Sequence, residues 1–313
     1  MLSRTADNLY WVSRYIERAE FLARILDATA RLATLPAAYG GAGNEWTTAL
    51  LTAGADEGFA ELYDEANERN VQEFLAFSPD NPSSIRNCFE IARANARAVR
   101  TALTGEMWEA INQAHLELRR YDPKTMTREE FARFLEWVKS ASLAFDGSAY
   151  RTMLRSDAYW FSRLGVYVER ADNTARILDV KYHVLLPESE QVGGSLDYFQ
   201  WSTVLREVSA LTAYHWVYRQ SLKPWLVADL LILNRQMPRS LASSYENIVL
   251  FLDNLGRAYG RQGAAQRQSR SLLARLENTD IDAVFRHGLH QFIEDFVTDN
   301  NRLGSAISEQ YLV

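Results

Sequence analysis

The sequence has a single cysteine, Cys88, among its 313 residues, and it has no long run of apolar side chains. One cysteine excludes an intramolecular disulfide and a cysteine-based zinc site. The longest apolar run, Trp225 to Leu233, is interrupted by Asp229 and is far shorter than the ~20 residues that span a bilayer. The opening residues MLSRTADNLYW lack the apolar stretch of a secretory signal. We therefore expect a cytoplasmic protein that does not enter a membrane.

Nucleotide-binding motifs are also absent. The sequence has neither a glycine-rich phosphate loop of the Walker or Rossmann type nor a G-x-S-x-G motif. The glycine stretches at 40–43 and 193–195 are typical of linkers, so we expect no bound cofactor. With a net charge of −6 and an isoelectric point near 5.5, the chain is poorly suited to neutralising many phosphates. We therefore expect no nucleic acid among its partners.

The sequence does contain an internal repeat. Residues 15–27 (YIERAEFLARILD) and 167–179 (YVERADNTARILD) are identical at nine of thirteen positions, at an offset of 152. Residues 81–85 (NPSSI) return as 237–241 (MPRSL), at an offset of 156. Both offsets are close to half the chain length. The pattern therefore predicts one domain, 1–313, built from homologous halves at about 1–146 and 147–313 that are related by pseudo-two-fold symmetry.

The repeat retains its charges better than its apolar positions. Phe21 and Leu22 become Asn173 and Thr174, whereas most ionic positions keep their residue and all keep their sign. Isolated i,i+4 ion pairs on an exposed helix contribute only ~0.2–0.5 kcal/mol each, which is too little to explain this retention. Breaking a buried ion pair costs ~3–5 kcal/mol, so a buried network explains it better. We expect such a network to include Arg14, Glu17, Arg18, Glu20, Arg24, Glu169, Arg170, Asp172 and Arg176.

The twin motifs predict specific partners. A two-fold arrangement would bring Glu17 to Arg170 and Glu169 to Arg18 across the interface between the halves. The simplest interpretation is that these ions only fix how the halves dock. Two alternatives stay open: the ions form a ligand or partner site, or Glu17 and Glu169 act directly as catalytic acid or base.

Nearly every segment of the chain shows the period of an α-helix. We expect helices at about 3–34, 45–53, 58–68, 70–77, 84–103, 105–121, 127–145, 148–186, 196–219, 224–234, 239–257, 264–277 and 281–311. Ser83 is the expected N-cap of the fifth helix, and Thr127 with Glu130 forms a capping box. Pro224 and Pro238 stand where a first helical turn tolerates proline. No segment alternates as a strand does, so the predicted class is an all-α, multi-helix bundle.

The twin Glu-Arg motifs and several further segments resemble the bacterial alpha-E family, an all-helical domain of about this length. The resemblance runs along the whole chain and rests on the segments LSRTADNLYWVSRYIERAE, NPSSI, ARANARAVR, EMWEAIN, RLGVYVERADNTARILD, LLILNRQMPRSL and GLHQFI. The family occurs alongside circularly permuted ATP-grasp proteins and transglutaminase-like proteins. This association implies a role in a peptide or amide ligation system.

The resemblance favours one function and leaves two alternatives. In the leading hypothesis, the chain is an accessory subunit of an ATP-grasp peptide or amide ligase and has no ATP site of its own. It binds the ligase, or an acidic or peptide substrate, through arginine-rich helix faces. The first alternative is a stand-alone enzyme that uses Glu17 or Glu169 in a pocket between the halves. The second is a purely structural scaffold.

The helix that follows NPSS carries a stripe of arginines at spacings of 7, 4 and 3, namely Arg86, Arg93, Arg97 and Arg100. Arginine prefers bidentate contacts with carboxylates or phosphates. In an acidic chain, such a stripe favours an anionic substrate or an acidic partner. The ordinary alternative is a solvated helix face that pairs with acidic residues of neighbouring helices.

Two further groups have a possible chemistry. His287, His290 and Glu294 fall at i, i+3 and i+7, which would place three potential metal ligands on one face of the helix expected at 281–311. A packed or polar helix face is the simpler interpretation, and we expect no bound metal. Cys88 lies in the first turns of a helix with no histidine motif beside it, so we expect a core residue rather than a nucleophile.

Overall fold

The computed structural model describes residues 1–34, 45–183 and 195–312. Its α-helices are α1 (Ser3–Ala33), α2 (Glu45–Ala53), α3 (Asp56–Ala60), α4 (Glu68–Ala76), α5 (Ile85–Ala98), α6 (Gly105–Leu118), α7 (Arg128–Thr152), α8 (Asp157–His183), α9 (Ser195–Glu207), α10 (Leu211–Tyr218), α11 (Pro224–Ile232), α12 (Leu241–Tyr259), α13 (Ala264–Glu277), α14 (Ile281–His287) and α15 (Leu289–Ile307). A 3-10 turn and a π turn follow at Arg100–Ala102 and Ser308–Leu312. These ranges contain no strand, so the prediction of an all-α protein is confirmed for them.

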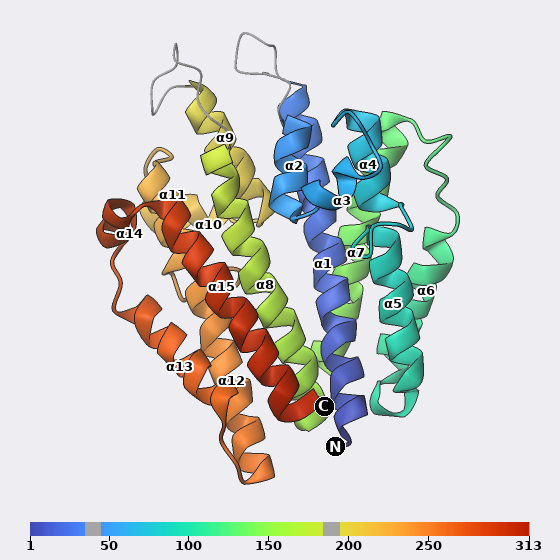
Figure 1. The fold of residues 1–313 in the computed structure, drawn as a ribbon, viewed down its shortest axis with the longest axis vertical. Helices are drawn as coiled ribbons and strands as arrows, with labels where there is room; N and C mark the ends of the chain where they lie inside the picture. Colours follow the sequence, from blue (N-terminus) through green and yellow to red (C-terminus); the bar gives the residue numbers. More distant parts are fainter. Residues whose placement is uncertain (35–44, 184–194, 313) are drawn as a thin grey trace.

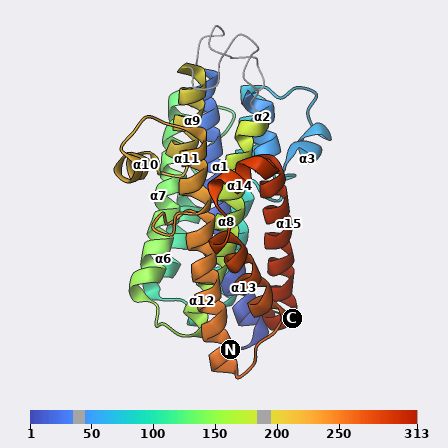
Figure 2. The ribbon, with the colours of Figure 1, turned by 90° about the vertical axis from the view of Figure 1, so that its left-hand side faces the viewer.

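Helices α1 and α8 lie side by side at the centre of the bundle (Figure 1). Helices α5 and α7 pack against α1, and α6 packs on both of them. Helices α12 and α15 pack against α8, and Figure 2 shows them on two sides of it. Both central helices are therefore covered around most of their circumference, and polar as well as apolar faces of α1 are buried.

Gly165 of α8 allows the two central helices to approach closely. A Cβ atom at this position would lie only 2.2 Å from the backbone oxygen of Tyr10 on α1. Next to this contact, the Oγ atoms of Ser13 and Ser162 lie 2.8 Å apart in a buried hydrogen bond between the helices. Small residues here set the distance between α1 and α8, and this distance brings the repeat motifs within reach of one another.

Serine N-caps open α5 and α12, the helices that follow the NPSSI and MPRSL segments. The Ser84 side chain accepts a hydrogen bond from the Asn87 backbone N–H, and Ser240 accepts one from Ser243. The expected cap at Ser83 is therefore wrong by one residue, since Ser84 occupies the capping position. The capping box of Thr127 and Glu130 at the start of α7 is present as expected.

Several of the expected boundaries up to the start of α8 are wrong. The helix expected at 84–103 ends at Ala98, and the helix expected at 148–186 begins only at Asp157. The helix expected at 58–68 ends at Ala60, because Asn67 caps the next helix and the chain must leave the helical path before it. Helix α7 runs through Asp146 and Gly147 without a break and ends at Thr152. Burial of Phe145 and Ala149 outweighs the ~1 kcal/mol that a glycine costs within a helix.

Expected helices in the second half are interrupted by residues with positive φ. Ser209, at φ +57°, separates α9 from α10 within the expected helix 196–219. Gly288, at φ +104°, separates α14 from α15 within 281–311. Pro224 occupies the first turn of α11 as expected, whereas Pro238 precedes the Ser240 cap and so lies outside α12.

Some expectations fall outside the described residues. These are the end of the eighth helix at Leu186 and the glycine linkers at 40–43 and 193–194. Within the described ranges, every helix is too short or too polar to cross a lipid bilayer.

Candidate functional site

The carboxylate of Glu169 on α8 is held by two arginines of α1. Arg18 donates from Nε to Oε1 at 2.6 Å and from Nη2 to Oε2 at 3.1 Å. Arg14 donates from Nε to Oε2 at 2.7 Å. The carboxylate is buried, with the residue only 3 % exposed, and both of its oxygens are occupied.

Glu17 on α1 makes the reciprocal contact with α8. Arg170 donates from Nε to Oε1 at 2.9 Å and from Nη2 to Oε2 at 2.8 Å. A second arginine, Arg239, donates from Nη1 to Oε1 at 2.9 Å. Each glutamate of the repeat thus pairs with the arginine of the other copy. The structure therefore contains both of the contacts that the twin motifs predicted.

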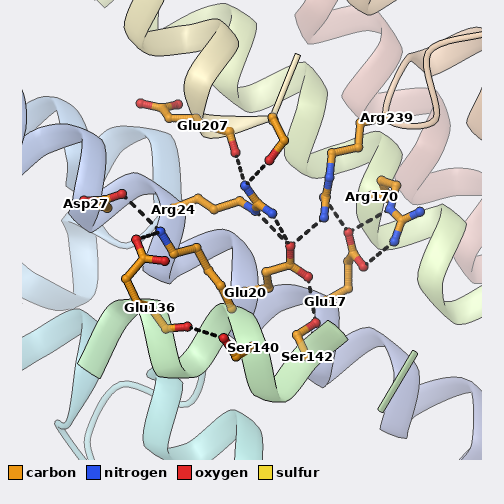
Figure 3. A network of polar contacts seen from close by, with 12 residues as sticks. Glu17, Glu20, Arg24, Asp27, Glu136, Ser140, Ser142, Arg170, Glu207 and Arg239 are labelled. Carbon is orange, nitrogen blue, oxygen red and sulfur yellow. Dashed lines mark hydrogen bonds and ion pairs between the residues drawn. The ribbon is translucent and has the colours of Figure 1, made fainter. Parts of the chain in front are cut away.

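Glu20 extends these contacts to further helices (Figure 3). Its Oε1 accepts hydrogen bonds from Arg24 Nη2 and from Arg239 Nη2, both at 2.6 Å. Its Oε2 accepts a hydrogen bond from Ser142 of α7 at 2.7 Å. The equivalent pair on α8 is Asp172 and Arg176, whose Oδ2 and Nε lie 2.6 Å apart. We use the name ER network for Glu20, Arg24, Asp172 and Arg176 together with Arg14, Glu17, Arg18, Glu169, Arg170 and Arg239.

Arg239 is the member that sequence analysis missed. It belongs to the MPRSL segment, at an offset of 156 from Ser83 in NPSSI. Ser83 accepts a hydrogen bond from Arg18 Nη1 at 3.3 Å, so equivalent positions of the two segments contact the two halves of the network. The repeat of NPSSI as MPRSL was therefore the sequence signal that could have identified Arg239. Thr174 donates to the backbone oxygen of Arg239 at 2.7 Å, which explains why this position is not apolar as Leu22 is.

The guanidinium groups of the two motif arginines also pack against tyrosine rings. Arg18 lies over the Tyr15 ring and Arg170 over the Tyr167 ring, with centroid distances of 5.5 and 5.4 Å. Each tyrosine precedes its arginine by three residues, which places both on one helix face. The rings contribute cation–π attraction and restrict the guanidinium groups to the orientation that the carboxylates require.

Burial and charge act in opposite directions on the two central carboxylates. Burial raises the pKa of Glu17, but Arg170 and Arg239 outweigh it and lower the pKa from 4.5 to about 2. Burial likewise raises the pKa of Glu169, and Arg18 and Arg14 lower it to about 2. Both groups are ionised at neutral pH, and all four of their oxygens are occupied. Neither can exchange a proton with a substrate unless an arginine first leaves.

The arginine stripe expected on one helix runs past the end of α5, because Arg100 lies in the 3-10 turn that follows it. Arg86 and Arg93 are half-buried, and Arg97 and Arg100 are exposed. Arg86 lies over the Phe77 ring at 5.2 Å, and Arg100 lies over the Trp108 ring at 5.3 Å. Arg93 donates to Asn112 of α6 at 3.0 Å. In the part of the chain that the structure describes, no ion pair links these arginines or the exposed Arg97 to a carboxylate. Pairing with acidic neighbouring helices, the ordinary interpretation of the stripe, is therefore not found there.

The three potential metal ligands do not share one helix. His287 ends α14, and the positive φ of Gly288 separates it from His290 and Glu294 on α15. His290 Nδ1 lies 2.7 Å from Asp179 of α8, whereas His287 is solvent-exposed. Among the described residues, no group of three or more histidine, cysteine, aspartate or glutamate side chains is arranged to hold a metal ion.

Cys88 is fully buried, and burial raises the pKa of its thiol to about 12. The thiol donates to the backbone oxygen of Ser83 at 3.3 Å. A thiol that stays protonated and inaccessible at neutral pH is a core residue, as its sequence position indicated.

Comparison with known proteins gives one match. Searches of curated proteins and of solved structures find no similar chain. A family model, described as "a predicted alpha-helical domain with a conserved ER motif", matches residues 1–312. The match spans both copies of the Glu-Arg motif, whose carboxylates and guanidinium groups meet inside the bundle. The chain belongs to the Alpha-E family.

Proposed function

We propose that this chain is an accessory subunit of an ATP-grasp peptide or amide ligase, and that it docks on the ligase through the arginine stripe of α5. The ligase supplies the ATP-dependent chemistry, and this chain supplies a binding surface in the cytoplasm. The choice of partner rests on the association of this family with circularly permuted ATP-grasp proteins. A transglutaminase-like protein is a further possible partner on the same grounds.

One observation carries the proposal of a docking surface. Arg97 and Arg100 are exposed, and no described carboxylate forms an ion pair with them. Trp108, half-buried, lies beside Arg100 and also beside Arg93. Arginine and tryptophan are the residue types that most often contribute the binding energy of an interface. In a chain with a net charge of −6, such a patch is suited to an acidic segment on the partner.

The ER network favours a structural role over catalysis. The carboxylates of Glu17 and Glu169 are held by four arginines from three different segments of the chain. Neither carboxylate lines the pocket of about 520 Å³ beside Arg24. A structural scaffold whose ions fix the packing of α1 on α8 is therefore the second candidate function, and the network is the observation that favours it.

Charge reversal on the stripe tests the docking proposal. We expect Arg97→Glu combined with Arg100→Glu to weaken capture of the purified ATP-grasp protein by at least about tenfold, because like charges then face each other. The matched control is Arg257→Glu with Arg267→Glu, two exposed arginines on α12 and α13 at the opposite edge of the bundle (Figure 1). The control changes the net charge equally, so we expect it to bind as the unmodified chain does.

The result is read against ligase activity with and without this chain. If the stripe variant and the control capture the ligase equally well, α5 is not the docking surface. If ligase activity is the same in the presence and absence of this chain, the accessory role itself is wrong. The scaffold function instead predicts that binding falls only in variants with a lower melting temperature.

A further inference from the structure

A pocket of about 520 Å³ lies between α1, α7 and the α9–α10 connection. Its charged wall residues include Arg24, Asp27, Glu136, Lys139, Arg206 and Glu207. Arg24 joins this pocket to the ER network, because it contacts Glu20 at one end and the backbone oxygen of Glu207 at the other (Figure 3). The volume lies within the range of small-molecule sites in proteins.

Glu207 is the unexplained group in this wall. The residue is only 9 % exposed, and its Oε2 atom has no hydrogen-bond partner among the described residues. Figure 3 shows its carboxyl group without a contact to the neighbouring side chains. Buried polar atoms in folded proteins are nearly always hydrogen-bonded, and exceptions often mark the site of a missing partner.

Two cations of the wall, Arg24 and Lys139, are already paired with other groups. Arg24 donates hydrogen bonds to the Glu20 carboxylate, to the backbone oxygen of Glu207 and to the Ser209 hydroxyl group. Lys139 Nζ lies 3.1 Å from Asp27 and 2.5 Å from Glu136. Neither of them forms an ion pair with the Glu207 carboxyl group. Glu207 therefore lies in the pocket wall without a cation on its buried Oε2 atom among the described residues.

The rest of the pocket indicates what such a donor would be attached to. Arg206, one helical step before Glu207, is exposed and forms no ion pair within the described residues. Leu143 and Leu211 provide apolar wall between the charged groups. A free carboxyl, a free guanidinium and a short apolar surface are complementary to a molecule with an ammonium group, a carboxylate and a small side chain.

We propose that this pocket binds an amino acid or short peptide, with its ammonium group on the carboxylate of Glu207 and its carboxylate on Arg206. The binding itself is independent of the ligase. Its use rests on the proposed function, because an amide ligase requires an amine to accept the activated carboxyl group.

The proposal also predicts a proton change. Burial raises the pKa of Glu207 well above 4.5; Arg24 opposes the rise, and Asp27 adds to it. The other charged groups of this wall, Arg31, Glu136, Lys139 and Arg206, are exposed or paired. An arriving ammonium group favours the ionised carboxylate, so ligand binding lowers the pKa of Glu207 and any proton that the group holds at the working pH is released.

Isothermal titration calorimetry of the full chain tests the proposal with L-alanyl-L-alanine as the probe. We expect millimolar or tighter binding, with release of a proton detected in buffers of different ionisation enthalpy. N-acetylation of the probe, which removes the ammonium group, weakens binding by at least about tenfold, and so does conversion of its carboxylate to an amide. Free alanine, run in parallel, distinguishes an amino acid from a peptide as the ligand.

One variant tests the contact with Glu207, and a second variant serves as its control. Glu207→Gln keeps the shape of the side chain but abolishes proton release and weakens binding by at least about tenfold. Glu68→Gln, in a separate pocket where Glu68 already pairs with Arg128, leaves binding unchanged. Equal binding of the acetylated probe, or unaltered binding by Glu207→Gln, overturns the proposal, as does the absence of binding. The ligase takes no part in these titrations, so their failure is distinct from a failure of the docking experiment.

Discussion

The arginines around Glu17 and Glu169 explain why the repeat conserves its charges. Each carboxylate is buried on one central helix and is neutralised by the arginine of the other copy. Loss of either glutamate leaves buried guanidinium groups without their counter-charge, and loss of one arginine leaves its glutamate with only one of its two cations. Either change is costly, so neither residue changes alone. These pairs could be predicted because the two copies stand in one sequence pattern. Ser142 could not, because nothing in the spacing of the repeat refers to α7.

Stability should fall steeply in acid. The pKa values of Glu17 and Glu169 lie at about 2 in the folded chain and at 4.5 in the absence of the fold. The unfolded chain thus takes up these protons first as the pH falls. The contribution of each group, ~3 kcal/mol, is fully present above pH 4.5 and is lost between there and about pH 2. Urea unfolding across this range measures it.

The pKa of Glu207 is shifted in the opposite direction to those of Glu17 and Glu169, so this residue serves as the control. Its raised pKa means that the unfolded chain loses the proton first, so this group lowers stability as the pH rises above 4.5. Glu207→Gln should therefore unfold at higher urea concentration than the unmodified chain near neutral pH and keep the acid transition. A free energy of unfolding that stays constant from pH 4.5 to about pH 2 would contradict the role assigned to Glu17 and Glu169.

Individual helices were predictable where local signals agree with packing. Helix α13 has the expected bounds, 264–277. Helix α7 begins with the expected capping box. The interruption at Ser209 was not predictable, because serine has no strong preference for a positive φ. Asp146 and Gly147 have the composition of a turn, but tertiary packing keeps them helical. Local propensity is decisive only where burial does not oppose it.

Replacement by alanine should have opposite effects on stability at Gly165, where α1 and α8 touch, and at Gly147, which lies outside this contact. Gly165→Ala places a Cβ atom 2.2 Å from the Tyr10 backbone, which forces the central helices apart and strains the ER network. We expect a loss of about 3 kcal/mol or more in the free energy of unfolding. Gly147→Ala in α7 meets no atom within 4 Å, so it should stabilise the chain by ~0.5–1 kcal/mol.

Urea unfolding of the two alanine variants, measured side by side, checks this prediction. Both replace glycine by alanine within a long helix, so the change in helix propensity is shared. A similar stability for the two variants would show that close approach at Gly165 is not what positions α8 on α1.

At the scale of the molecule, the sequence predicts the class of fold and the pairing of the two central helices. The relation of the halves 1–146 and 147–313 by a two-fold axis stays a prediction, and its expected boundary falls within α7. The pocket beside Glu207 was not predicted. Its walls come from α1, α7 and α9, which are distant in sequence and share no recurring motif. Such a site becomes visible only when the helices are packed.

The packing of α1 on α8 depends on ion pairs in which the glutamate of each motif contacts the arginine of the other. A double-mutant cycle on Glu17 and Arg170 measures one of these pairs directly. Glu17→Ala and Arg170→Ala should each cost ~3–5 kcal/mol, because each leaves a buried charge. The exposed pair Glu129 and Arg133 on α7 is the control, and we expect its coupling energy to stay below ~1 kcal/mol. For Glu17 and Arg170, the account predicts a coupling energy of at least about 2 kcal/mol. Costs that simply add, to within about 0.5 kcal/mol, would contradict it.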